Sequence, residues 1–245
     1  MEIFTQGGYA FLARWLHFLA GIMWIGLLYY FNFVQVPAFV EMGAQARSEA
    51  LQKITWRALW WFRWGAALTL LTGLLILGFN EQFTRDYFTS PAGTSIATAA
   101  ILGIVMFSNV WLVIWPAQRI VIGSARRVSE GGEADPGAPA AARRALLASR
   151  ANTLFSIPLL FFMGATSHLA GSSHFVAQAS NDSLLAYWVI FVVVAGAIEL
   201  DALGRFAGYA PGWTKAPFDS IRGALITGLV LLVIFYLVFE LLFQA

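Results

Sequence analysis

Long apolar stretches separated by short polar ones dominate this chain. Six of them are long enough to cross a hydrocarbon core about 30 Å thick, which takes roughly 20 residues of helix. They lack the strict apolar–polar alternation of membrane β-barrel strands. Because backbone amides inside lipid must be paired within the protein, the pattern predicts an all-α bundle of about six transmembrane helices. The expected spans are about 9–33, 60–79, 95–116, 152–171, 184–203 and 221–243.

The basic residues between these spans predict how the bundle is oriented, since Lys and Arg are retained on the cytoplasmic side. Thirteen of the fifteen lie in or beside loops one, three and five, whereas loop two has only Arg85 and loop four has none. Both termini are therefore expected on the periplasmic or outer side. The thirteen are Arg47, Lys53, Arg57, Arg63, Arg119, Arg126, Arg127, Arg143, Arg144, Arg150, Arg205, Lys215 and Arg222.

Two of the cytoplasmic segments have distinctive compositions. Residues 117–151 include the run GGEADPGAPAAA, which is rich in Gly, Pro and Ala and lacks apolar periodicity, so we expect a flexible cytoplasmic loop. Residues 34–59 mix apolar and charged positions at helical spacing, which is typical of an amphipathic helix lying along the inner surface. No internal repeat is evident, and we expect residues 1–245 to form a single integral membrane domain.

Composition narrows the possible chemistry. Apolar residue types make up 59% of the 245 residues and charged ones 11%, about half the charge of a soluble domain. The expected partner is therefore the lipid bilayer. Nearly all of the arginines mark membrane topology, so the net charge of +2 does not indicate nucleic-acid binding. The absence of cysteine excludes disulfides, thiolate metal sites, iron–sulfur clusters and covalently attached c-type haem. Any metal or haem must be held by His, Met or carboxylates.

Ionisable residues inside a span are costly and therefore mark candidate functional sites. His17, in the first expected helix, has Gly21 one turn deeper, and His168, in the fourth, has Gly164 one turn deeper. Each imidazole thus adjoins a helix face without side chains, which is what a flat cofactor such as haem requires. The pattern predicts His17 and His168 as ligands of the iron of haem b.

Neighbouring residues extend this candidate site. Arg14 lies one turn nearer the outer surface than His17, where a haem propionate needs a cation, and Trp24 lies on the same face. Met163 or His174 are alternative ligands. The competing interpretation is structural: Gly lets membrane helices approach closely, and a membrane His can simply hydrogen-bond a neighbouring carbonyl.

Two acidic residues mark the inner end of the fifth expected helix. Glu199 and Asp201 lie beside Arg205, and we expect them to form a charge cluster at the lipid surface without a catalytic role.

Three stretches resemble the membrane domain of the membrane-bound urate oxidase (urate hydroxylase) family, in which a multi-helix domain precedes a periplasmic cytochrome c. They are RWLHFLAGIMWIGLLYYFNF (14–33), WFRWGAALTLLTGLLIL (61–77) and SRANTLFSIPLLFFMGATSHLAG (149–171). The most specific matching positions are Trp15, Leu16, His17, Gly21, Trp24, Ile25, Gly26, Arg150, Asn152, Ser156, Pro158, Met163 and His168.

The resemblance implies a redox module of the bacterial inner membrane that delivers electrons on the periplasmic side. Because the chain ends at Ala245 without a cysteine, we expect it to lack the family's cytochrome c and to pass electrons to a separate cytochrome. It could then be an oxidoreductase subunit, but urate oxidation itself is not expected.

Three alternatives stay open. A quinone could bind near the histidines, with either imidazole as proton acceptor. The chain could instead be a cofactor-free structural or assembly subunit of a respiratory or photosynthetic complex. A permease ranks last, because helices two and three offer few polar groups along a path. Those groups are Thr69, Thr72, Thr98, Ser108 and Asn109.

Overall fold

The structure is a computed structural model that describes residues 2–170, 172–176 and 178–244. Apart from one isolated antiparallel bridge between Phe175 and Gln244, these residues contain no β-structure. The α-helices are α1 (Gln6–Tyr29), α2 (Val36–Glu41), α3 (Ala44–Ala50), α4 (Trp56–Phe79), α5 (Arg85–Thr89), α6 (Pro91–Ser108), α7 (Trp115–Ser129), α8 (Ala138–His168), α9 (Asn181–Ala202), α10 (Ala216–Asp219) and α11 (Ile221–Phe243). The π-helical segments are η2 (Tyr30–Gln35), η3 (Leu51–Thr55) and η4 (Asn109–Ile114), and the 3-10 turns are η1 (Glu2–Phe4) and η5 (Trp213–Lys215).

Six continuous helical stretches in the described residues are long and apolar enough to cross a membrane, which confirms the predicted all-α fold with six spans. Residue 171, where the fourth span was expected to end, lies outside the described residues. The six stretches are Gln6–Glu41, Ala44–Phe79, Pro91–Ser129, Ala138–His168, Asn181–Ala202 and Ile221–Phe243.

The flexible loop predicted over 117–151 is wrong for most of its length. Helix α7 continues to Ser129 and α8 begins at Ala138, so only a short turn separates them. The residues on both sides are rich in Ala and Arg, which favour helix, and a proline in the first turn of α8 costs nothing because its N–H would be unpaired there. The break falls at Gly131, whose φ of 86° suits glycine.

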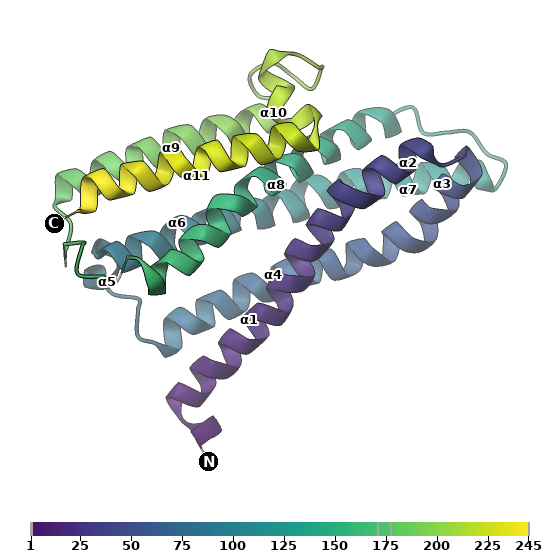
Figure 1. Cartoon of the computed structure of the whole chain (residues 1–245). Coiled ribbons are helices and arrows are strands. Elements are labelled where there is room, and N and C mark those ends of the chain that lie inside the picture. Colours follow the sequence, from purple (N-terminus) through teal and green to yellow (C-terminus); the bar gives the residue numbers. More distant parts are fainter. Residues whose placement is uncertain (1, 171, 177, 245) are drawn as a thin grey trace.

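The segment 34–59 also differs from its prediction, because it continues the first two spans as α2, α3 and η3. A stretch of 36 residues is about 54 Å long and exceeds the hydrocarbon core, so one end must project into the headgroups and water. Figure 1 shows α2, α3, α7 and α10 at one end of the bundle, opposite both chain termini. We call it the basic end, because the arginine-rich loops lie there.

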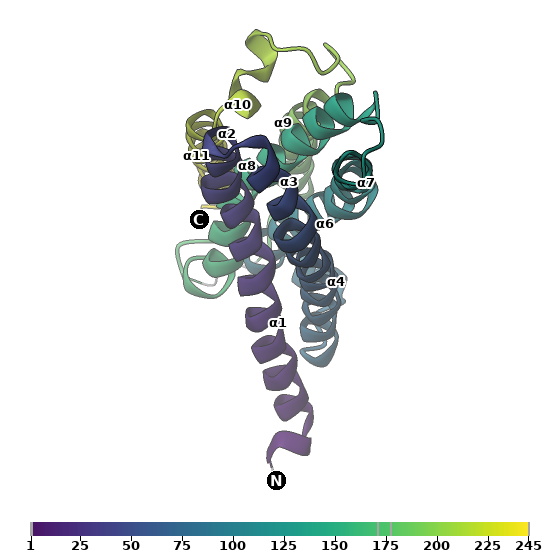
Figure 2. The same cartoon turned by 90° about the vertical axis from the view of Figure 1, so that its right-hand side faces the viewer.

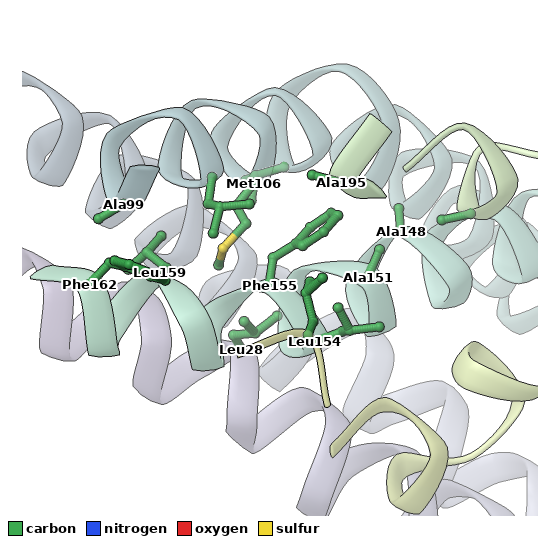
Figure 3. Packing of buried hydrophobic residues seen from close by; sticks show 14 of the residues in the cluster. Leu28, Ala99, Met106, Ala148, Ala151, Leu154, Phe155, Leu159, Phe162 and Ala195 are labelled. Carbon is green, nitrogen blue, oxygen red and sulfur yellow. The ribbon is translucent and has the colours of Figure 1, made fainter. Parts of the chain in front are cut away.

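Helix α8 lies at the centre of the bundle. Its apolar window is 67% buried by the rest of the chain, whereas the windows of the other five spans are 22–33% buried. Figure 3 shows its side chains Leu154 and Phe155 in the core with Met106 of α6 and Leu28 of α1. The other spans therefore face lipid on most of their surface and shield α8 from it.

Helices α1 and α4 form a closely packed pair. At Gly65 of α4, an added Cβ would lie 3.3 Å from the backbone nitrogen of Trp24 in α1, so the two backbones nearly touch. Towards the N-terminus this pair projects away from the other helices, as both views show (Figures 1 and 2).

A glycine contact between α8 and α11 provides a test of this packing. At Gly228 of α11, a Cβ would lie 2.7 Å from the backbone oxygen of Leu154 in α8. We expect Gly228→Ala to push the helices apart and to cost about 1–3 kcal/mol of unfolding free energy, measured by thermal unfolding in detergent. Gly196→Ala in α9 is the matched control, because a Cβ there meets no atom within 4 Å. Equal losses in the two variants would contradict the packing.

Candidate functional site

His17 is held between α1 and α4. Its Nδ1 lies 3.1 Å from the hydroxyl oxygen of Thr72, and that hydroxyl donates its proton to the carbonyl of Leu68 at 2.7 Å. With its proton directed to a carbonyl, the Thr72 oxygen is left to accept from His17, an arrangement that favours the tautomer with the proton on Nδ1. Gly73 makes room for the ring, because a Cβ there would be 3.2 Å from Cε1 of His17.

His168 ends α8, and its side chain is exposed. Its Nδ1 lies 3.0 Å from the carbonyl oxygen of Gly164, one turn earlier in the same helix. A carbonyl can only accept a hydrogen bond, so Nδ1 is protonated here as well. Among the described residues, neither histidine makes a hydrogen bond through Nε2. Nε2 of each imidazole therefore has no partner among the described residues, and in a neutral imidazole with its proton on Nδ1 this nitrogen is the one that can bind a metal.

The two histidines also lie at equal distances along their helices from one shared contact. Helices α1 and α8 are joined by a hydrogen bond of 2.9 Å between the hydroxyl groups of Tyr29 and Ser156. His17 precedes Tyr29 by twelve residues, and His168 follows Ser156 by twelve residues in a helix that runs the opposite way. At 1.5 Å per residue, each histidine is about 18 Å from this contact towards the same end. No hydrogen bond joins the two imidazoles.

The other residues predicted for this site have mixed surroundings. A Cβ at Gly21 or at Gly164 would meet no atom within 4 Å, so the helix faces beside both histidines are open. Arg14 is exposed and takes part in none of the ion pairs between described residues. Trp24 is only 3% exposed, and its indole Nε1 has no hydrogen-bond partner.

The alternative ligands named above are placed differently. Met163 is half-buried against the main core, and His174 is exposed in the segment that follows α8. The described part of the chain holds no group of three or more His, Asp or Glu side chains that could bind a metal ion. Metal binding by protein groups alone therefore has little support, whereas a haem needs only one or two axial ligands.

A second cluster of polar residues, which the sequence pattern did not predict, surrounds α8 nearer the basic end. Asn152 is fully buried, and its amide nitrogen donates to the carbonyl of Met106 at 2.9 Å. The amide nitrogen of Asn109 donates to Asn152 Oδ1 at 2.9 Å and to Glu199 Oε2 at 3.1 Å. Three helical segments are thus joined by one hydrogen-bonded network.

This network corrects the expectation for Glu199. Instead of forming a surface cluster with Asp201 and Arg205, Glu199 is half-buried and accepts a hydrogen bond from Asn109. Asp201 forms a separate ion pair of 2.5 Å with Lys215, whose side chain is completely buried. The Asp201–Lys215 pair ties the segment before α10 to the end of α9.

Arg150 is the most costly residue of the polar cluster. It is 5% exposed, its Nε donates to Asn32 Oδ1 at 2.8 Å, and its Nη1 has no partner. Asn32 in turn donates to the hydroxyl of Ser149 at 2.8 Å and to the carbonyl of Leu28 at 2.9 Å. Arg150 forms no direct ion pair with any described residue, and the more distant carboxylate of Asp219 compensates its buried charge only in part.

The π-helical segments supply several partners in this region. Asn32 lies in η2 and Asn109 in η4, while Thr55 of η3 donates to Gln35 of η2 at 2.9 Å. Such wide turns are frequent at functional sites. Apolar periodicity does not reveal a π-turn. The available signals were the lone asparagines within the apolar runs YYFNF and MFSNVW.

Five spans packed around a sixth, polar central span define this chain as a polytopic α-helical membrane protein. Residues 80–200, just under half of the chain, match the family model described as urate oxidase N-terminal, which supports a urate oxidase N-terminal-like assignment. The matched stretch contains Arg150, Gly164, His168 and Glu199 but not His17. Comparisons with curated proteins and with solved structures found no match.

A double-mutant cycle tests the polar network. We expect Asn109→Leu and Asn152→Leu each to destabilise the protein, and their combination to reveal a coupling of about 1 kcal/mol, as for hydrogen bonds between membrane helices. Unfolding free energies in detergent provide the measurement. The control cycle pairs Asn152→Leu with Thr69→Val, because the Thr69 hydroxyl bonds only the carbonyl of Gly65 in its own helix. The control changes should add, and zero coupling between the asparagines would refute the network.

Proposed function

We propose that this chain is a membrane redox module that holds a b-type haem through His17 and His168. The observation that carries the proposal is the shared hydrogen-bonding pattern of the two imidazoles. In both, Nδ1 is tied to an oxygen acceptor on the protein, which fixes the ring and leaves Nε2 free. Metal-binding histidines typically have this second hydrogen bond.

The arrangement of α1 and α8 is compatible with a macrocycle between them. Helices in direct contact lie about 8–10 Å apart, which leaves no room for two imidazoles and a macrocycle. Figures 1 and 2 show α1 and α8 close together near the basic end and separating towards the end that carries the histidines. Equal distances along the two helices from their shared contact, together with the increasing separation, support a ligand bridging α1 and α8.

Several residues would position and surround such a group. The open faces at Gly21 and Gly164 would allow a flat ring to lie against the helices. Arg14, one turn outward from His17, would provide a cation for a propionate, and Trp24 offers an unpaired indole donor. When bound, haem b would supply a reversible one-electron couple.

The cellular setting belongs to the same proposal. The bias of basic residues supports both termini on the periplasmic side of a bacterial inner membrane, with the histidines in the outer half. Electrons would then pass to a separate cytochrome on that side. The urate oxidase N-terminal match supports a redox role, although it names no cofactor.

Two other functions have support from specific observations. A quinol hydroxyl could donate a hydrogen bond to Nε2 of either imidazole, which has no partner among the described residues. A cofactor-free subunit is favoured by the apolar face of α1, where Phe11, Phe18 and Ile22 are 61%, 63% and 71% exposed and could pack against partner helices. The haem proposal differs from both in predicting a visible spectrum.

The spectrum is the direct test. We expect the purified protein to show a b-type α-band in the dithionite-reduced minus oxidised difference spectrum, and the double variant His17→Ala/His168→Ala to lose it. His174→Ala is the matched control, because this third histidine is exposed outside the helices and should leave the band unchanged.

Two results would reject the haem assignment. One is the absence of a band in wild-type protein that added haem does not restore. The other is an unchanged band in the double variant. A quinone extracted from wild-type protein but not from the double variant would then favour the quinone alternative, and its absence from both would favour the structural subunit.

A second variant tests the role assigned to Thr72. We expect Thr72→Val to remove the acceptor of His17 Nδ1 and to weaken haem retention by about tenfold, the lower range for loss of a partner of a metal ligand. Haem content after titration and gel filtration measures this effect. Thr69→Val, one turn away with its hydroxyl on Gly65, should retain haem like wild type. Equal retention by the two variants would contradict the role of Thr72.

A further inference from the structure

A pocket of about 560 Å³ lies at the basic end, far from both histidines along the helices. It is formed where η3 and the first turns of α4 face α7. Its lining combines three basic side chains with two tryptophans and one amide: Lys53, Arg57, Arg126, Trp56, Trp60 and Gln52.

Helix lengths place this pocket at the surface of the hydrocarbon core. About 20 residues of helix cross the core, so counting back from Phe79 at the far end of α4 puts the boundary near Trp60. Arg57 and Lys53 then lie one and two turns further out, among the headgroups. In the neighbouring span, the same count from Pro91 reaches the boundary near Trp111. Arg126 lies fifteen residues further along this span, outside the core, and lines the pocket from its water-facing side.

The pocket carries uncompensated positive charge. Lys53 forms an exposed ion pair of 3.2 Å with Glu49, but Arg57 and Arg126 form no ion pair with any described residue. Arg57 donates to the carbonyl of Lys53 at 2.7 Å, which holds its side chain in place beside the pocket.

The aromatic wall next to the pocket is fixed by packing. The ring centroids of Trp56 and Trp115 are 5.2 Å apart, and the guanidinium of Arg63 lies 3.6 Å from the centroid of the Trp115 ring. A cation over an indole face is a stabilising contact. The wall therefore joins α4 to α7 and adds a further positive charge near the pocket.

We propose that this pocket binds the headgroup of an acidic phospholipid. The ligand chemistry is a phosphate anion, which guanidinium groups bind through paired hydrogen bonds. Tryptophan rings favour the boundary between headgroups and acyl chains, and basic pockets beside membrane helices bind acidic lipids. Because Trp60 lies at that boundary, the pocket is next to the acyl chains of the bilayer. This position favours a lipid, which has acyl chains, over a free phosphate, which has none.

Native mass spectrometry of the detergent-purified chain tests the proposal. We expect phosphatidylglycerol to remain bound at lower added concentrations than phosphatidylcholine with the same acyl chains. Each basic residue near an acidic surface contributes about 1 kcal/mol, so Arg57→Gln/Arg126→Gln should weaken phosphatidylglycerol binding about 25-fold. The matched control is Arg205→Gln, an exposed arginine at the same end but outside the pocket, which should lower binding by less than twofold.

Three outcomes would overturn the proposal. The first is equal binding of the two lipids by the wild-type protein, and the second is an equal loss in the pocket and control variants. The third is displacement of phosphatidylglycerol by millimolar inorganic phosphate, which would assign the pocket to a soluble anion. Circular dichroism of each variant verifies that the helices are intact, and all three substituted arginines are exposed. The test does not involve His17 or His168, so its outcome is independent of the haem proposal.

Discussion

Helix α8 carries arginine, asparagine, serine and threonine through an apolar bundle, which is possible only because other helices cover it. Unpaired polar groups cost several kcal/mol in lipid, so such a helix must be central and must find partners on its neighbours. Its apolar window is accordingly about two-thirds buried. The partners are Tyr29 and Asn32 on one side and Asn109 on the other. These contacts fix the positions of α1 and α6 along the axis of α8.

The same contacts divide the molecule into two ends with different character. Near Tyr29, α1 is tied to α8, but towards the N-terminus it follows α4, through the close approach at Gly65 and the His17–Thr72 hydrogen bond. The histidines thus lie on two helices that separate from each other. At the basic end, the helices extend beyond the hydrocarbon core, and their charged side chains lie in the headgroup region. A redox ligand at one end and a lipid at the other would not compete.

Residue patterns anticipated much of the fold and part of the site. Six spans were predictable because the cost of placing a residue in lipid depends mainly on its type. The pairing of His17 with Gly21 was visible because both lie on one helix face. The loop over 117–151 was mispredicted because Gly and Pro at its centre outweighed the helix-favouring Ala and Arg beside them. The environment of Glu199 was mispredicted because its hydrogen-bond partner, Asn109, is remote in sequence.

The apolar stretches and the charged residues in the sequence determined that most of this chain lies in lipid and how many spans it has. They also determined which residues would be energetically costly inside those spans. Packing decided how each costly residue is paired. Asn109 meets Asn152 and Glu199 at separations of 43 and 90 residues, and His17 meets Thr72 at 55. Local patterns cannot encode such pairs, because they depend on which helices adjoin and on how far each is rotated. The two histidines differ in this respect, because Nδ1 of His168 meets the carbonyl of Gly164 in its own helix, whereas only the packing of α1 against α4 could bring Thr72 to His17.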